Sequence, residues 1–306
     1  MRIARPLPAS LGPSFSTGDA ERVSVGRTRR DGADLVRTFR GARAVRTPST
    51  FTESVGAYRP LLRPAQRFGG KTALRLWGLP CPGWWSPAEP LEIVVPPDAA
   101  PPRRPGVRGY RVAPTDDSES VLDGVPLLDP VAALFTAAHG LTVTQTIVLI
   151  DAILATSSAY RGRSRRHPLV FRDDIESRLR QRGRIPGCGA VRAALKDARA
   201  GVESPKETET RLLIIRHGMP EPVVQYIVRD RGRFLARVDL GYPQWRIAVE
   251  YEEDDHRTDR EQWRRDIQRQ RDLEDGGWTV IRLTEADLHE PAAFLRHLRR
   301  AIAAAL

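Results

Sequence analysis

Hydrophobic and polar residues follow a regular order along the last hundred residues of the chain. The segments VVQYIV, FLARVDL and RIAVEY are short and apolar, as strands are, and Gly232 marks a turn between the first two. The segments DREQWRRDIQRQRDLEDGG, WTVIRLT and PAAFLRHLRRAIAAAL continue as a polar helix, a strand and a closing helix. With the helix that precedes them, they predict the order helix, three strands, helix, strand, helix.

The preceding helix starts in SPKETETRLLIIRHG. Ser204 suits the N-cap, Pro205 suits the first turn, and Glu207 lies three residues after the cap. Glu207 therefore has a plain structural explanation as a capping residue. Arg211, four residues further on, also allows an intrahelical ion pair with Glu207.

The pattern of residues 51–200 predicts a second α/β unit. FGGKTALRLWGLP (68–80) is expected to be a helix closed by Gly78, and LEIVVP and GYRVAP are expected to be extended around a proline-rich loop. Asp129 and Pro130 open a helix, because Asp caps well and Pro fits the first helical position. VAALFTAAHG and TVTQTIVLIDAILA are two apolar helical segments, and two more helices are predicted near 172–182 and 188–199.

The pattern of residues 1–50 predicts a winged helix. Residues 14–31 contain two short helices, the first capped by Ser16 or Thr17 and the second by Ser24. LVRTFRGARAV alternates apolar and basic positions around a glycine, which is typical of a hairpin. In a winged helix the second helix and the hairpin meet DNA phosphates. The predicted contacts are Arg27, Arg29 and Arg30 on the helix and Arg37, Arg40 and Arg43 on the wing.

Composition places the chain among globular proteins. Of its 306 residues 41% are hydrophobic and 28% charged, and no apolar run approaches the roughly 18 residues of a membrane span. The start MRIARPLPASLGPSF has no continuous apolar core, so we expect no secretory signal, no membrane partner and a cytoplasmic location. The predicted fold class is α/β (α+β), with a winged helix at 1–50, an α/β domain at 51–200 and a mixed sheet flanked by helices at 201–306.

Charge is unevenly spread along the chain, whose formal net charge is +11. Residues 204–306 carry 18 basic and 19 acidic residues, a net charge of −1, whereas 1–203 carry 31 basic and 19 acidic residues, a net charge of +12. A basic front end suggests contact with a polyanion such as DNA. The alternative is that overall composition favours arginine, since 46 of the 49 basic residues are Arg.

Residues 238–256 nevertheless hold six carboxylates and one arginine. Alternate residues of a strand share a face, so Glu250 and Glu252 point the same way, and Asp239 lies on the neighbouring strand across a turn. Carboxylates that converge on apolar strands repel one another and are costly to desolvate, which a hard dication relieves. The sequence therefore predicts a Mg²⁺ (or Mn²⁺) site at Asp239 and Glu250. Surface acidity is the alternative, and it suits residues 253–255 better.

Several short motifs follow one another in this region. They are S-P-x-E at 204–207, V-D-L at 238–240, V-E-Y-x-x-x-x-H-R at 249–257, Q-W-R-R-D-I at 262–267 and G-W-T-V-I-R-L-T at 277–284. In this order they resemble the endonuclease-like domain related to very-short-patch-repair nucleases, a branch of the PD-(D/E)XK superfamily. Residues 1–200 resemble, more loosely, the winged helix and second α/β unit of actinobacterial AbiEi-type antitoxins.

The resemblance implies a restriction-endonuclease-like sheet and metal-dependent hydrolysis of DNA phosphodiesters. It makes Asp239 and Glu250 the metal-binding carboxylates, and Glu207 the helix-borne acid that supports the metal or its water. Glu252 occupies the place of the superfamily lysine. His256 matches the histidine that follows the carboxylate strand and positions or deprotonates water.

Two departures from the superfamily pattern keep other functions open. No lysine follows Lys206, so the cation that stabilises the developing phosphorane charge must be Arg257, Arg269 or the metal itself. Residues 253–255 add negative charge where many relatives carry a small glycine. The alternative is a non-catalytic, antitoxin-like DNA-binding regulator with a degenerate nuclease domain, for which a toxin would be the partner. A nuclease that acts on RNA with the same metal site is the third interpretation.

Overall fold

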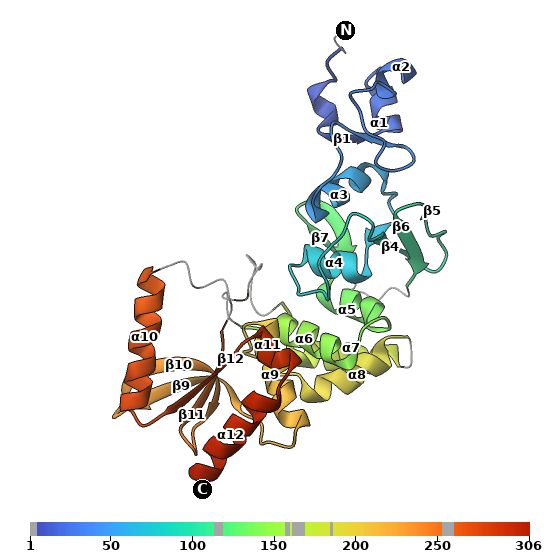
Figure 1. Ribbon diagram of the computed structural model, residues 1–306. Helices are drawn as coiled ribbons and strands as arrows, with labels where there is room; N and C mark the ends of the chain where they lie inside the picture. The colour runs from blue at the N-terminus through green and yellow to red at the C-terminus, as the bar shows by residue number, and fades with distance from the viewer. Residues whose placement is uncertain (1–4, 113–118, 157–159, 161–168, 184–185, 253–259) are drawn as a thin grey trace. The chain divides into compact units, whose positions relative to one another are not determined.

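The computed structural model shows helices and strands in three separate sheets (Figure 1). This mixed content confirms the predicted α/β (α+β) fold class. The structure describes residues 5–112, 119–156, 160, 169–183, 186–252 and 260–306. The chain divides into two compact units, Met1–Leu141 with Arg184–Gly189 and Thr142–Gly183 with Ala190–Leu306. Among the described helices, none is both long and apolar enough to cross a bilayer.

The first unit begins with two short helices, as the sequence predicts, but Ser14–Ser16 form a strand instead of the start of the first helix. The predicted hairpin is reduced to one bridge, because the strand Ala42–Ala44 pairs mainly with Ser14–Ser16. The strands are β1 (Ser14–Ser16) and β2 (Ala42–Ala44), which pair antiparallel, and a further bridge joins Val36 to Ala44. The helices between them are α1 (Thr17–Arg22) and α2 (Arg27–Arg30). Buried Leu11, Phe15, Ala20 and Val25 form the core of this segment.

A side-chain cap fixes the start of α1, whereas the start of α2 has no side-chain cap. Ser16 Oγ accepts the Asp19 N–H at 3.0 Å and Asp19 accepts the Ser16 N–H at 3.1 Å, a reciprocal cap that fixes the start of α1. The prediction that Ser24 caps the second helix is wrong. Ser24 has a left-handed backbone with φ +60°, and the N-cap is Gly26. The chain therefore bends at Ser24 before α2 begins.

A sheet of mixed strand direction forms the rest of the first unit. Its strands lie in the order β5-β6-β4-β3-β8-β7. They are β3 (Arg67–Phe68), β4 (Leu91–Val95), β5 (Arg103–Arg104), β6 (Val107–Arg111), β7 (Glu119–Leu122) and β8 (Val125–Leu128). The helices of this part are α3 (Phe51–Tyr58), α4 (Gly70–Leu76) and α5 (Pro130–Ala138), with 3-10 turns at Ala9–Leu11 and Arg59–Leu61.

Two predicted helix starts in this unit have different outcomes. The helix predicted over 68–80 is too long, because Phe68 pairs with Ile93 and Leu127 in the sheet and the helix starts at Gly70. The start of α5 is confirmed. Its N-cap Asp129 accepts the N–H groups of the second and third helical residues at 2.9 and 3.2 Å.

The second unit contains the four-stranded sheet β12-β11-β10-β9, in which β11 and β12 are parallel and the other neighbours are antiparallel. The helix–strand order predicted from the sequence is confirmed, with α11 as an additional short helix. The strands are β9 (Val223–Asp230), β10 (Arg233–Tyr242), β11 (Ile247–Tyr251) and β12 (Thr279–Leu283). The helices are α6 (Val143–Leu154), α7 (Arg172–Arg182), α8 (Cys188–Asp197), α9 (Pro205–Arg216), α10 (Arg260–Asp275), α11 (Glu285–His289) and α12 (Ala292–Ala304).

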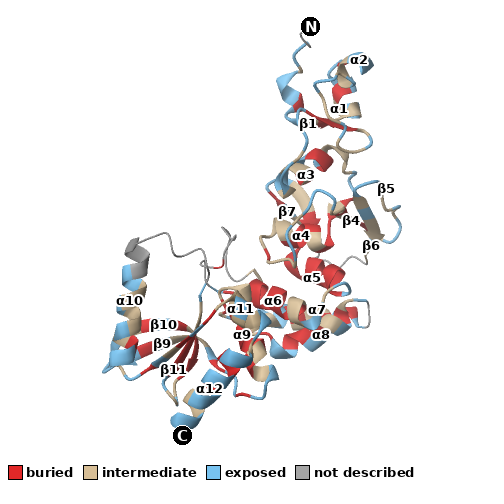
Figure 2. Ribbon diagram, viewed as in Figure 1, coloured by how far each residue is buried: buried red, intermediate tan, exposed pale blue. Residues whose placement is uncertain are grey.

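Helices cover both faces of this sheet. On one face, Ile214 of α9 and Phe294 and Leu298 of α12 pack against β10, β11 and β12. On the other face, Leu273 of α10 packs with Trp278 and with residues of β9, β10 and β11. Figure 2 shows buried residues along these strands, whereas much of α10 and α12 is exposed. The sheet is thus covered on both faces, and its two inner strands carry Asp239 and Glu250.

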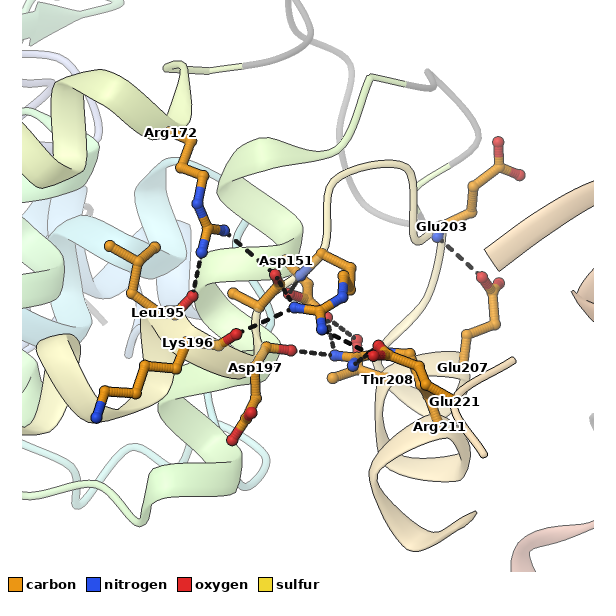
Figure 3. Close-up of polar contacts among 12 residues, drawn as sticks. Asp151, Arg172, Leu195, Lys196, Asp197, Glu203, Glu207, Thr208, Arg211 and Glu221 are labelled. Carbon is orange, nitrogen blue, oxygen red and sulfur yellow. Dashed lines mark hydrogen bonds and ion pairs between the residues drawn. The ribbon is translucent and has the colours of Figure 1, made fainter. Parts of the chain in front are cut away.

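The helix α6 joins this unit through a buried ion pair (Figure 3). Arg211 of α9 is fully buried and contacts Asp151 of α6 at 3.3 Å, the Asp197 carbonyl at 2.6 Å and Glu221 at 2.9 Å. Asp151 also accepts the Thr208 hydroxyl at 2.9 Å. We predict from the sequence that 1–50, 51–200 and 201–306 are separate domains. Whether each range folds independently stays a prediction. The compact unit, however, begins near residue 142 and includes α6.

Candidate active site

Asp239 and Glu250 lie where the pairing of β10 with β11 ends. The paired residues run from Tyr242 and Ile247 to Leu240 and Val249. Beyond Val249, the Tyr251 N–H donates to the Asp239 carboxylate at 3.0 Å. The strand pairing therefore brings the two predicted metal ligands to the same place, as expected from their spacing.

A pocket of about 210 Å³ opens at this point. Carboxylates and arginines dominate its lining, which consists of Asp239, Glu250, Tyr251, Glu252, Asp266, Arg269 and Arg282. Arg269 of α10 pairs with Glu250, and Arg282 of β12 lies beside Glu250 in the parallel register. Arg282 also approaches Glu252 at 3.8 Å. The pocket thus holds groups suited to binding a cation and a phosphate.

Glu207 reaches the same region from the first turn of α9. Ser204 Oγ accepts its backbone N–H at 3.1 Å, which confirms the predicted cap. The Glu207 carboxylate is buried and accepts the Glu203 N–H at 3.0 Å (Figure 3) and the Gln225 amide at 2.8 Å. Arg211 pairs with other acids instead, so the intrahelical ion pair considered for Glu207 is not formed. The Glu207 carboxylate accepts the N–H of Glu203 and not that of the N-cap Ser204, so the predicted reciprocal capping box is not formed.

Burial and mutual repulsion raise the pKa values of two of these acids. Desolvation raises the pKa of Asp239 to about 6, and the charge of Glu250 adds to this, while the Tyr251 N–H and Arg269 oppose it. Desolvation, followed by the charge of Asp239, raises the pKa of Glu207 to about 7. Both acids are therefore costly to ionise in the protein alone.

This donor set suits a hard dication. Carboxylate oxygens are the ligands that Mg²⁺ prefers, and one or two of them suffice when water and phosphate oxygens complete the shell. A cation would also favour the charged forms of Asp239 and Glu207, whose pKa values burial raises. Within the described residues, no three His, Cys, Asp or Glu side chains form a group able to hold a metal by themselves. A metal here would thus depend on few protein ligands.

The other predicted residues have different positions. Glu252 follows β11, its N–H donates to the Leu283 carbonyl at 2.9 Å, and its side chain is 43% exposed. It lines the pocket but is less buried than Glu250, whose side chain is 12% exposed. His256 and the acids at 253–255 lie outside the described residues.

Sequence reasoning missed Gln225 as a residue of this region. The pairing of Val224 with Leu240 and Tyr226 with Val238 places Gln225 opposite Asp239. Its backbone is left-handed with φ +49°, a rare conformation for a residue with a side chain, and its amide donates to Glu207. A polar residue between the apolar positions of VVQYIV is the signal that the sequence offers.

The N-terminal arginines fall into two groups of three. Arg29, Arg30 and Arg43 have side chains 18%, 12% and 11% exposed, and they pair with the nearby acids Asp34, Glu21 and Asp31. Arg27 and Arg37 have side chains 90% and 71% exposed, and Arg40 is also exposed. Arg27 and Arg37 also approach Asp31, at 3.9 and 3.3 Å, so this acid faces arginines of both groups. The first group is held within the segment, whereas the second group remains largely exposed to solvent.

Comparison with known proteins gives relatives but no family. No protein-family model and no solved structure matches the chain. It is similar to two proteins of Mycobacterium tuberculosis, Uncharacterized protein MT2308 of strain CDC 1551 / Oshkosh and Uncharacterized protein Rv2248 of strain ATCC 25618 / H37Rv. Each is 38% identical over 136 residues, which cover 42% of this chain and 50% of the relative. The matched part therefore spans half the length of these relatives.

Proposed function

We propose that this protein is a Mg²⁺-dependent endonuclease that hydrolyses phosphodiester bonds in DNA. The observation that carries the proposal is the convergence of Asp239 and Glu250 in one pocket, with Glu207 electrostatically coupled to Asp239. Burial raises the pKa values of Asp239 and Glu207 and so makes their charged forms costly, which is typical of a functional site. The resemblance to the PD-(D/E)XK superfamily supports the same reaction, because Asp239 and Glu250 occupy its two carboxylate positions.

In this proposal each side chain has a defined task. Asp239 and Glu250 bind the cation, which supplies charge stabilisation at the phosphate and a more acidic water. Glu207 orients the attacking water, and the Glu203 N–H and Gln225 amide hold its carboxylate in place. The positive charge for the phosphate comes from the cation itself and from Arg269, which lines the pocket. His256 has the water-positioning role that the resemblance assigns to it.

The exposed arginines Arg27, Arg37 and Arg40 support DNA as the substrate. Phosphate contacts by arginine position a protein on a duplex without reading its sequence. The net charge of +12 in residues 1–203 strengthens attraction to any polyanion. The proposal places the protein in the cytoplasm, with DNA as its partner.

The second candidate is a DNA-binding regulator of the antitoxin type, whose nuclease domain serves as a scaffold. The observation that favours it is the pairing of both pocket arginines with acids, Arg269 with Glu250 and Arg282 with Glu252. A carboxylate at position 252, where the superfamily carries lysine, favours it as well. In this case a toxin is the expected protein partner.

A cleavage assay with matched variants tests the proposal. The purified full chain is incubated with plasmid, linear duplex, mismatched duplex and RNA, in Mg²⁺, Mn²⁺ or EDTA. We expect cleavage of DNA with either cation, loss of cleavage in Asp239→Asn and Glu250→Gln, and normal cleavage in the control Glu209→Gln. Cleavage of no substrate by the unaltered protein, together with retained DNA binding, would favour the regulator. Cleavage of RNA but not of DNA would mean that the substrate is RNA.

A further inference from the structure

Arg269 pairs with Glu250, one of the two carboxylates proposed to bind the cation. Its guanidinium pairs with the Oε1 atom of Glu250. Its charge also opposes the burial that raises the pKa of Asp239. Leu273, four residues later, is fully buried against the sheet and anchors the same face of α10. The backbone of α10 therefore holds Arg269 at the mouth of the pocket.

In the metal-free protein, the Arg269 guanidinium serves as the counterion of the acidic site. Two acids of one pocket repel each other, and a guanidinium relieves part of that repulsion. A divalent cation bound to Glu250 competes with Arg269 for the same oxygen atom. The side chain of Arg269 is 37% exposed and lies on the helix surface, so it has room to leave Glu250.

We propose that Arg269 is an exchangeable counterion that couples binding of the metal to binding of the nucleic acid. When the cation binds Glu250, the guanidinium is released and pairs with a phosphate of the substrate. Bidentate pairing of arginine with phosphate is strong and oriented, so the phosphate offers a full replacement for Glu250. The inference rests on the proposed nuclease function and adds how that site is regulated.

The exchange predicts positive cooperativity between the two ligands. Metal binding to the protein alone must break the Arg269–Glu250 pair and leave a guanidinium without a partner. With DNA present, the released guanidinium gains a phosphate, so the metal binds more tightly. By linkage, the metal strengthens DNA binding by the same factor. The site therefore loads its cation mainly when substrate is present.

Arg282 provides the matched control for this exchange. It is another arginine of the same pocket, but it approaches Glu252 at 3.8 Å and has its backbone in the sheet. Replacing it removes the same charge from the pocket without freeing Glu250. A difference between the two variants therefore reports the pair with Glu250 and not the loss of a positive charge.

The test is calorimetric titration of the full chain with Mn²⁺, with and without a nuclease-resistant phosphorothioate duplex whose integrity is checked after each titration. In the unaltered protein the duplex should tighten Mn²⁺ binding about 5- to 50-fold, within the usual range of coupling between two ligands. In Arg269→Gln, Mn²⁺ alone should bind several-fold more tightly, and the duplex should add little. In Arg269→Lys, the Mn²⁺ affinity and the effect of the duplex should both lie between those of the unaltered protein and those of Arg269→Gln. Arg282→Gln should keep the coupling between Mn²⁺ and the duplex.

The outcomes separate this inference from the function on which it rests. If Asp239→Asn abolishes Mn²⁺ binding but Arg269→Gln leaves affinity and coupling unchanged, the counterion role is wrong and the metal site stands. If Arg269→Gln weakens Mn²⁺ binding in the absence of DNA, the counterion role is also wrong. If Mn²⁺ binds equally well to Asp239→Asn, the proposed metal site itself is wrong.

Discussion

Arg211 and Asp151 form an ion pair in which both side chains are fully buried, with a separation of 3.3 Å. They are 60 residues apart in the sequence and belong to α9 and α6. Burial raises the pKa of Asp151 to about 6 even though Arg211 and the Arg199 and Thr208 hydrogen bonds oppose the shift. The pair makes α6 part of the structural support behind Glu207, which lies on the same helix as Arg211.

The first prediction is that Arg211→Met destabilises the second unit in a pH-dependent manner. Removing one partner of a buried pair leaves an uncompensated charge, which costs about 3–5 kcal/mol. We expect that cost at pH 8, where Asp151 must either ionise without its partner or keep a proton far above its usual pKa. At pH 5 the carboxyl is protonated, and we expect less than half of the cost. Urea unfolding of the full chain at both pH values measures the difference.

The control for Arg211→Met is Arg199→Met. The Arg199 side chain is 37% exposed and pairs with Glu221 at 2.8 Å, so its loss should cost at most about 1 kcal/mol at either pH. Its backbone N–H to Asp151 is unaffected by the substitution. Equal costs for the two variants would mean that the buried pair has no special role.

The buried pair also shows where sequence reasoning ends. The order of helices and strands after residue 204 could be predicted, because capping residues and the alternation of apolar residues are local. The spacing of Asp239 and Glu250 across one turn likewise predicted their convergence. Contact between Asp151 and Arg211 could not be predicted, since nothing local distinguishes a buried aspartate in an apolar helix from a surface one. The contact of α6 with α9 is therefore seen only in the structure.

Gln225 gives a second example of what the sequence does not reveal. Strand propensity predicted an ordinary extended residue within VVQYIV, but the backbone there is left-handed with φ +49°. Such strain is sustained when side-chain contacts determine it, and here the contact is the hydrogen bond to Glu207. The position of the Glu207 carboxylate thus depends on a residue outside the predicted motifs.

The second prediction concerns this backbone at Gln225. In an ordinary strand, a protein with Gly at a given position is less stable than one with Ala there by roughly 0.5–1 kcal/mol. At a left-handed position the order reverses, so Gln225→Gly should be more stable than Gln225→Ala by about 1 kcal/mol. Both variants lose the amide that holds Glu207 and should lower cleavage. Thermal unfolding and the cleavage assay measure the two effects.

Ile227, also on β9, is the matched position for that comparison. Its backbone is not left-handed and it is 45% exposed, so Ile227→Ala should be more stable than Ile227→Gly. The same order of Ala and Gly at residues 225 and 227 would contradict the strained backbone at Gln225.

The third prediction concerns DNA binding by the exposed arginines of the first segment. Replacing Arg27, Arg37 and Arg40 by Ala should weaken binding to any duplex sequence. Each lost phosphate contact should reduce the slope of log affinity against log salt by about 0.9. Fluorescence anisotropy at several salt concentrations measures both quantities in the full chain.

Two comparisons control for total charge and for folding. Replacing Arg296, Arg299 and Arg300 of α12 by Ala removes the same charge from an exposed helix and should change the slope little. Arg43→Ala should mainly lower stability, because Arg43 is buried and contacts Asp31 at 2.5 Å and the Arg30 carbonyl at 3.0 Å. A larger loss of DNA binding from the α12 variant would move the DNA contact to the second unit.

Asp239 and Glu207 contribute to the pH dependence of the metal-free protein. The folded-state pKa values of Asp239 and Glu207 are raised to about 6 and about 7. Between about pH 4 and 7 the folded state therefore holds more protons than the unfolded state. The contribution of these two acids to the free energy of unfolding then falls as the pH rises through this range. A bound dication reverses the trend, because it stabilises the charged carboxylates.

The last prediction follows from this sign and uses Glu207→Gln. The amide cannot ionise, its oxygen can still accept the Glu203 and Gln225 hydrogen bonds, and Asp239 loses the charge that repels it. We expect the metal-free variant to be about 1–3 kcal/mol more stable than the unaltered protein at pH 8, and similar to it at pH 4. The control Glu209→Gln, a half-buried acid of the same helix that pairs with Lys206, should keep the original pH dependence. Urea unfolding between pH 4 and 8 in EDTA measures these curves. A variant less stable at pH 8 would mean that the Glu207 charge stabilises the fold, as expected of a simple capping residue.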